Sequence, residues 1–296
     1  MTFIDPTVRA LVESSGLEPW RVDEVITRAL EEDLGAEGDV TTIATIAPGQ
    51  EASATLTPRQ AGVVAGLPVA AWVFDVVGET SLRVEFAMID GSPVRPGEVL
   101  ATVTGPVGAI LTAERTALNL LCHLSGVATL THRWVEAVAG TGAQIRDTRK
   151  TMPGLRALEK YAVRCGGGVN HRMSLSDAAL VKDNHVAAAG GVARAFDLVR
   201  ERYPDLPIEV EVDTVAQARE AMAAGAELIL LDNMPVSQLR EAVAAASEYP
   251  DVRLEASGGL SLENARAVAE TGVHYLAVGA LTHSAPVLDI GLDLAP

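Results

Sequence analysis

From residue 143 onward, the chain alternates short stretches typical of β-strands with longer stretches typical of α-helices. The predicted strands are Ala143–Asp147, Ala179–Lys182, Ile208–Val212, Leu228–Asp232, Arg253–Ser257 and His274–Gly279. Apolar residues spaced three or four apart predict helices between the later strands, and Ser261 is placed to cap one of them. Repeated strand–helix units predict a parallel sheet, which is either doubly wound or closed into a barrel.

One predicted strand decides between these two architectures. In residues 208–213 the acidic side chains share one face and the aliphatic side chains share the other. A doubly wound sheet is covered by helices on both faces, so its strands are apolar throughout, whereas a row of carboxylates indicates the interior of a barrel. Several predicted strands also end in charged residues or glycine. The active site of such a barrel lies at the carboxyl ends of its strands, which is where we expect it here.

Before residue 143 the pattern is different. An amphipathic helix, Val22–Leu34, precedes several short predicted strands, and a long helix, Ile110–Ala139, follows them. The strands are Ser53–Leu56, Gly62–Val64, Leu82–Phe86 and Val99–Val103. We therefore expect an α/β protein with an N-terminal α+β sandwich-like domain that consists of residues 1–117 and also includes the tail, residues 281–296. An incomplete α/β barrel, residues 118–280, would form the rest.

Composition excludes several classes of function. The net charge of −16 argues against general affinity for nucleic acid or for anionic membranes. The first residues lack the basic and apolar regions of a signal peptide. The longest apolar stretch, Ala61–Phe74, contains Pro68 and is too short to span a bilayer. Two cysteines make no disulfide framework. We expect a cytoplasmic protein that binds neither membranes nor nucleic acid.

The cations are distributed unevenly. Only three of the 23 cationic residues are lysines, and Lys150, Lys160 and Lys182 all lie within residues 146–182. Eight cations face three acids in that window, inside an acidic protein. A lysine persists where a compact ammonium cannot be replaced by a planar guanidinium, so the window predicts a pocket for anions. The alternative is chance clustering of a rare residue. Lys160 lies on a helix-like stretch, where we expect a structural role.

The types of cation predict the kind of anion. A guanidinium grips a carboxylate with two parallel hydrogen bonds, so Arg149 and Arg172 suit a planar dicarboxylate. An ammonium acts on a phosphate as a point charge, so Lys150 and Lys182 suit a polyphosphate. His171 lies between Asn170 and Arg172 and could donate to either anion, or could be a structural histidine.

Two acids end neighbouring strands. Glu211 and Asp232 would bind ribose hydroxyls, help to hold Mg²⁺ and stabilise positive charge at a reacting sugar carbon. Their alternative role is pairing with the basic residues. Glu209 and Glu255 lie deeper in their strands, and we expect structural ion pairs there.

Glycines end the last two predicted strands. Gly258 and Gly259 precede the helix that Ser261 caps, and Gly279 follows the next strand. Backbone N–H groups can approach an anion closely at such positions, and two late strand ends are the usual phosphate site of a barrel. We expect a phosphorylated substrate.

At these residues the sequence resembles the quinolinate phosphoribosyltransferases over nearly its whole length. The matching segments are Ala113–Asn119, Asp147–Thr151, Pro153–Arg156, Glu159–Val163, Gly166–Arg172, Leu180–His185, Leu231–Met234 and Ala256–Gly259. The resemblance implies the type II phosphoribosyltransferase fold, a homodimer with shared active sites and Mg²⁺ as cofactor. It also implies transfer of phosphoribosyl from 5-phosphoribosyl 1-diphosphate to quinolinate. The products would be nicotinate mononucleotide, diphosphate and CO₂, as in NAD biosynthesis.

The same resemblance implies roles for individual residues. Quinolinate would be held by Arg149, His171, Arg172 and the partner subunit's Arg115. The substrate-binding residues would also include Thr148, Lys150, Lys182, Glu211, Asp232, Ser257, Gly258, Gly259, Val278, Gly279 and Ala280. Lys150, Lys182, Glu211 and Asp232 would be the catalytic residues, with Glu211 and Asp232 near the metal. For Arg115 the alternative is a pair with an acid on its own helix.

Three other functions fit parts of this pattern. A phosphoribosyltransferase of the same fold could act on nicotinate or another aromatic acid. A Schiff-base aldolase would use Lys182 as its nucleophile. A binding module without catalytic activity would bind both ligands and release no diphosphate.

Overall fold

The computed structural model describes residues 4–295, which form two compact units. Unit 1 consists of the described residues up to His132, of Thr151–Gly167, and of the described residues from Thr282 onward. Unit 2 consists of Arg133–Lys150 and Gly168–Leu281. These bounds differ from the expected border between residues 117 and 118, because the long helix α5 (Val107–Ala137) runs through that position without a break. The segment Thr151–Gly167, expected in the barrel, packs with unit 1.

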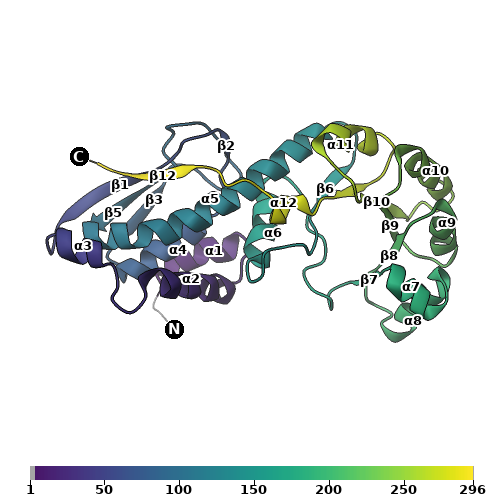
Figure 1. The fold of residues 1–296 in the computed structure, drawn as a ribbon, viewed down its shortest axis with the longest axis horizontal. Helices are drawn as coiled ribbons and strands as arrows, with labels where there is room; N and C mark the ends of the chain where they lie inside the picture. The colour runs from purple at the N-terminus through teal and green to yellow at the C-terminus, as the bar shows by residue number, and fades with distance from the viewer. Residues whose placement is uncertain (1–3, 296) are drawn as a thin grey trace. The chain divides into compact units, whose positions relative to one another are not determined.

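Unit 1 contains an antiparallel sheet in the strand order β12-β1-β5-β3. Its strands are β1 (Glu51–Pro58), β3 (Arg83–Phe86), β5 (Ala101–Pro106) and β12 (Ile290–Leu294). Burial alternates along β5, where Ala101 and Val103 face the core and the threonine after each of them is more exposed. β12 lies along β1 with Leu292 opposite Leu56 (Figure 1), which confirms that the tail returns to the N-terminal part of the chain. A small separate ribbon pairs β2 (Gly62–Val63) with β4 (Pro93–Val94).

Unit 1 also contains helices. They are α1 (Pro6–Ser14), α2 (Pro19–Leu34), α3 (Val40–Thr45), α4 (Leu67–Gly78), α6 (Arg156–Cys165) and the first part of α5. The most apolar of them, α4, contacts α1, α2 and β3 and buries Trp72 and Phe74 completely. At its start the Asp90 carboxylate accepts the N–H groups of Gly66 and Leu67, at 2.7 and 3.1 Å. Among residues 4–295, no helix is both long and apolar enough to cross a membrane.

Unit 2 is built on six parallel strands in the order β6-β11-β10-β9-β8-β7. The strands are β6 (Gln144–Arg146), β7 (Ala179–Val181), β8 (Ile208–Val212), β9 (Leu228–Asp232), β10 (Arg253–Ser257) and β11 (Tyr275–Ala277). All six were predicted, within two residues at each end. The outer strands β6 and β7 are not paired with each other in the described chain, and one bridge from Arg146 to Val169 extends the sheet beside β6. The barrel is therefore incomplete, as expected.

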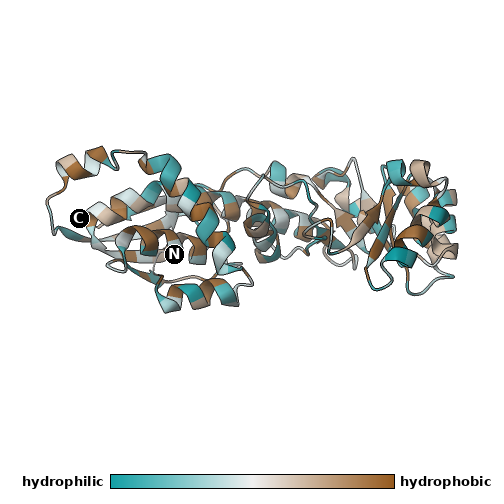
Figure 2. Ribbon diagram, turned by 90° about the horizontal axis from the view of Figure 1, so that it is seen from below, coloured by the Kyte–Doolittle hydropathy of each residue, from teal (hydrophilic) through white to brown (hydrophobic). Residues whose placement is uncertain are grey.

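Helices follow the strands of unit 2 in turn. They are α7 (Asp183–Ala189), α8 (Val192–Arg202), α9 (Val215–Ala223), α10 (Val236–Ala246) and α11 (Leu262–Ala269), with the short α12 (Ala280–His283) at the unit border. Ser261 begins α11 as predicted, and its N–H donates to Asn264 Oδ1 at 2.9 Å. Figure 2 shows the strands of unit 2 mainly in brown, while its helices carry both teal and brown. The apolar faces of the helices therefore cover the sheet.

Candidate active site

A cavity of about 640 Å³ lies at the carboxyl ends of the strands of unit 2. It brings together most of the site residues predicted from the sequence: Thr148, Arg149, Lys150, His171, Arg172, Lys182, Glu211, Asp232, Ser257, Gly258 and Gly259. These residues come from the segment after β6, from the segment before β7 and from the ends of β7, β8, β9 and β10. Parallel strands place their carboxyl ends at one edge of a sheet, which is why residues up to 111 positions apart in sequence meet here.

Cations line one side of the cavity. Arg172 donates from Nη1 to the carbonyl oxygen of Ala178 at 2.7 Å, while its buried Nε has no hydrogen-bond acceptor among the described residues. Burial lowers the pKa of Arg172, and the charge of Arg149 lowers it further. Beside them, Thr148 Oγ1 accepts the N–H of Lys150 at 3.0 Å. Two guanidinium groups close enough to repel each other suit a ligand with two carboxylates, which would offset that repulsion.

Acids lie at the ends of the neighbouring strands β8 and β9. Lys182 Nζ lies 3.0 Å from Glu211 Oε2, and Asp232 Oδ2 accepts from Asn233 Nδ2 at 2.7 Å. The pairing of Glu211 with a basic residue is the alternative named above, and the structure contains it. The ammonium side chain remains 48% exposed, so solvent weakens the ion pair and a charged substrate can compete for both partners. The contact of Asp232 is thus with a neutral amide.

The turn after β10 is shaped for close backbone approach. Gly258 and Gly259 have positive φ angles of 81° and 60°, and a Cβ atom on Gly258 would lie 2.2 Å from Oδ1 of Asn233. Any larger residue at Gly258 would clash with that side chain. α11 begins three residues after Gly259, so its N-terminus lies next to the turn. Asn233 itself has a φ of 53°, and its N–H donates to the Ser257 carbonyl at 2.8 Å.

Four predicted residues lie elsewhere. Val278, Gly279 and Ala280 follow β11, but in the described chain only Ala277 from this segment lines the cavity. The Val278 N–H donates to the Arg146 carbonyl at 2.9 Å, which ties the segment to β6. Arg115 is exposed on α5 in unit 1 and does not line the cavity. Within residues 4–295, no ion pair joins Arg115 to an acid of α5, so the alternative role is not found.

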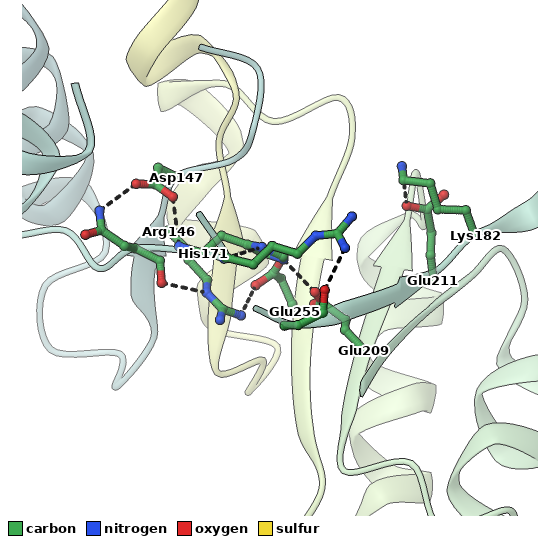
Figure 3. A network of polar contacts seen from close by, with 10 residues as sticks. Arg146, Asp147, His171, Lys182, Glu209, Glu211 and Glu255 are labelled. Atoms are coloured by element: carbon green, nitrogen blue, oxygen red, sulfur yellow. Dashed lines mark hydrogen bonds and ion pairs between the residues drawn. The ribbon is translucent and has the colours of Figure 1, made fainter. Parts of the chain in front are cut away.

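A buried polar network forms the floor of the cavity (Figure 3). Arg146 Nη1 lies 2.8 Å from Glu255 Oε2, and its guanidinium stacks on the ring of Tyr275 at 4.8 Å. His171 Nε2 lies 2.5 Å from Glu209 Oε2 and 3.8 Å from Glu255 Oε1. Glu209 and Glu255 thus lie in the interior as expected, where they contact His171 and Arg146. Burial raises the pKa of Glu255 to about 8, with a further contribution from the charge of Glu209.

Sequence reasoning missed the residue that holds His171 in place. Asp147 is fully buried and accepts from Asn170 Nδ2 at 2.6 Å and from the His171 N–H at 2.8 Å. His171 Nδ1 in turn accepts the N–H of Arg172 at 2.8 Å, which leaves Nε2 to donate to Glu209. The available signal was the position of Asp147 at the end of a predicted strand, just before the cationic residues. A buried carboxylate at such a position needs hydrogen-bond partners nearby.

Comparison with known proteins agrees with this geometry. Residues 39–125 match the family model for the quinolinate phosphoribosyl transferase N-terminal domain, and residues 127–293 match that for its C-terminal domain. The chain is 56% identical to nicotinate-nucleotide pyrophosphorylase [carboxylating] of Mycobacterium leprae, over 92% of this chain and 96% of the relative. It is 42% identical to the probable enzyme of that name from Bacillus subtilis, over 89% and 90%.

Solved structures agree with the sequence relatives. The crystal structure of NadC from Streptococcus pyogenes is 39% identical and matches with a TM-score of 0.89, over 95% of this chain and 99% of that one. Nicotinate-nucleotide pyrophosphorylase from Ehrlichia chaffeensis is 37% identical and matches with a TM-score of 0.87, over 92% and 98%. Both family models and both kinds of relative extend over the two units described above. The chain belongs to the quinolinate phosphoribosyltransferase family.

Proposed function

We propose that the protein transfers the phosphoribosyl group of 5-phosphoribosyl 1-diphosphate to quinolinate with loss of CO₂. The products are nicotinate mononucleotide and diphosphate. The observation that carries this proposal is that one cavity combines two neighbouring guanidinium groups, carboxylates at the ends of β8 and β9, and a glycine turn next to a helix N-terminus. These three features suit a dicarboxylate, a ribose and a phosphate, respectively.

The charges explain why such a cavity is needed. Quinolinate is a dianion and the donor is a polyanion, so the two repel each other in solution. Arg149 and Arg172 would bind the carboxylates, with His171 at the cavity floor beneath them, and Lys150 and Lys182 would hold the diphosphate. The 5-phosphate would lie at Ser257–Gly259, with Val278–Ala280 nearby. Once bound, the pyridine nitrogen and the ribose C1 are held together, and most of the rate arises from this positioning and from fixed charge.

Glu211 and Asp232 are the residues that fit the developing positive charge. As the bond from C1 to diphosphate breaks, C1 gains oxocarbenium character, and carboxylates at the cavity wall stabilise it. Their partly exposed oxygens are also the hard ligands that Mg²⁺ prefers, together with substrate phosphates. Bound there, Mg²⁺ would neutralise charge on the leaving diphosphate.

We also infer a cytoplasmic homodimer in which the partner subunit's Arg115 completes each site. Arg115 is exposed on α5 and is not among the residues that line the cavity, which motivates the shared site. Two free cysteines, Cys122 and Cys165, fit a reducing compartment.

Diphosphate release tests the proposed reaction. With quinolinate, 5-phosphoribosyl 1-diphosphate and Mg²⁺, we expect diphosphate and CO₂ in equal amounts. Replacing quinolinate by nicotinate should slow release sharply, because one guanidinium is then left without its carboxylate. Equal rates with the two acids would show that the protein is a phosphoribosyltransferase of broader specificity. Trapping of Lys182 by borohydride with a carbonyl substrate would instead indicate an aldolase.

A further inference from the structure

Glu255 is buried at the cavity floor, and one of its oxygens lacks a hydrogen bond. The side chain has no exposed surface, and Oε2 is held by Arg146 at 2.8 Å. Oε1 has no hydrogen-bond partner among the described residues, and His171 Nε2 lies 3.8 Å from it. A buried carboxylate oxygen without a donor is costly, and a proton on that oxygen removes the charge.

The charges around Glu255 favour that proton. β6 contributes Arg146 and Asp147, β8 contributes Glu209, and the segment before β7 contributes His171. β11 places Tyr275 beside it in register, while β9 contributes only the apolar Leu230. The acids outnumber the guanidinium that faces them, and burial is the largest cause of the raised pKa of Glu255, at about 8. Below that pH the group is a carboxylic acid, and above it the proton is lost.

The proposed reaction consumes such a proton. The pyridine nitrogen forms a bond to ribose C1 while the bond from C1 to diphosphate breaks. The bond between C2 of the ring and its carboxylate then breaks, CO₂ leaves, and the electron pair stays on C2. C2 must take up one proton to give nicotinate mononucleotide. A donor whose pKa lies near the working pH serves this step better than an ammonium or a guanidinium, which hold their protons more tightly.

We propose that Glu255 stores the proton that C2 of the pyridinium ring takes up when its carboxylate leaves as CO₂. The inference rests on the proposed function. Glu255 and His171 both line the cavity, whereas Glu209 does not, so Glu255 is the acid of the buried network that borders the cavity. The Oε1–H bond breaks as the C2–H bond forms, and Glu255 is left as a carboxylate paired with Arg146. Solvent returns the proton after the product leaves.

Glu255→Gln tests the proposal in a single turnover, with diphosphate and nicotinate mononucleotide measured separately in quenched samples. The glutamine keeps the shape of the side chain but stores no transferable proton. Diphosphate should appear at close to the wild-type rate, whereas nicotinate mononucleotide should form about 100-fold more slowly. In the wild type, formation of the mononucleotide should fall as the pH rises through about 8. That pH dependence should vanish in Glu255→Gln and return in part in Glu255→Asp.

Glu209→Gln is the matched control. Glu209 is also buried, and its charge raises the pKa of Glu255. Removing that charge should therefore lower the pKa of Glu255. The inflection in the pH profile should therefore move to lower pH without disappearing. If Glu255→Gln does not fold, Glu209→Gln and Glu255→Asp still test the proposal. An inflection at the wild-type pH in the mononucleotide profiles of both variants would overturn it.

Other results overturn it directly. Equal slowing of diphosphate and mononucleotide formation in Glu255→Gln would assign Glu255 a purely structural role. An unchanged mononucleotide rate would show that C2 takes its proton from elsewhere. A wild-type protein that releases no diphosphate from quinolinate and the donor would refute the proposed function instead, and this result is distinguishable because it appears before any variant is made.

Discussion

Replacing Asp147 by asparagine should disturb the segment that carries His171 and Arg172. The two carboxylate oxygens accept from Asn170 Nδ2 at 2.6 Å and from the His171 N–H at 2.8 Å, in a position with no exposed surface. An asparagine offers one carbonyl oxygen and one NH₂ group. Whichever way the amide is turned, its NH₂ group faces one of the two donors. That donor then has no acceptor, and the other donor bonds a neutral carbonyl oxygen instead of a charged carboxylate.

The expected cost follows from those two contacts. A hydrogen bond to a charged group contributes about 1.5–3 kcal/mol, so the loss of one amounts to roughly 2–3 kcal/mol. For a unit of this size the melting temperature should fall by roughly 4–12 °C. If about half of the free energy appears as misplacement of Arg172, the KM for quinolinate should rise about tenfold, since 1.4 kcal/mol is a factor of ten.

The assay compares thermal unfolding and quinolinate KM in Asp147→Asn and in Asp177→Asn. Asp177 also accepts two backbone N–H groups, from Met173 and Ser174 at 2.6 and 2.8 Å. Desolvation raises the pKa of Asp177, but these bonds and the Ser174 hydroxyl outweigh it and lower the pKa to about 2. Asp177 is exposed, however, so water can replace its contacts and the cost should be about 1 kcal/mol or less. Equal melting temperatures for Asp147→Asn and the wild type would refute the argument that burial makes these hydrogen bonds costly to lose. A lower melting temperature with a normal quinolinate KM would refute the argument that Asp147 positions Arg172.

Three further outcomes are expected. Arg172→Lys should raise the KM for quinolinate at least tenfold and change the donor KM less, because a lysine cannot supply the paired hydrogen bonds; normal saturation by quinolinate would remove Arg172 from the acid site. Glu211→Ala and Asp232→Ala should lower kcat more than they raise either KM, as expected for contacts made mainly in the transition state; losses confined to donor affinity would make them ribose ligands only. Inactive Arg115→Ala and Lys150→Ala dimers, unfolded and refolded together, should recover roughly a quarter of wild-type activity, because about half of the dimers are hybrids with one intact site each; hybrids without activity would show that Arg115 serves its own subunit.

The strands of the barrel were predictable because side-chain periodicity reports which face is buried. In β8 the alternation of acids and aliphatic residues placed Glu209 and Glu211 on the inner face, and both lie there, one in the floor network and one at the cavity wall. Strand ends then predicted most of the cavity lining. No local pattern shows how deep in the interior a side chain lies, so the depth of Glu209 and Glu255 was predicted only roughly.

Long-range partners and the course of the chain were not predictable. Lys160 was expected to have a structural role, but its complete burial was not evident, because a lysine in an amphipathic helix is normally assigned to solvent. Arg146 and Glu255 lie on strands separated by β11, and their contact depends on the curvature of the sheet. Thr151–Gly167 resembles a connection within the barrel, yet it packs in unit 1, where Glu159 lies 2.9 Å from His123 of α5. Such pairings are decided by tertiary packing.

The return of β12 to β1 has a consequence for the protein while it is being synthesised. β1 and β5 leave the ribosome early, but the strand that covers the other edge of β1 follows about 180 residues later, or roughly 10–40 s at common elongation rates. During that interval the edge of β1 presents unpaired N–H and C=O groups, which can pair with other chains. The nascent chain therefore carries an open template for aggregation until translation is nearly finished, and chaperone demand should be concentrated in that interval.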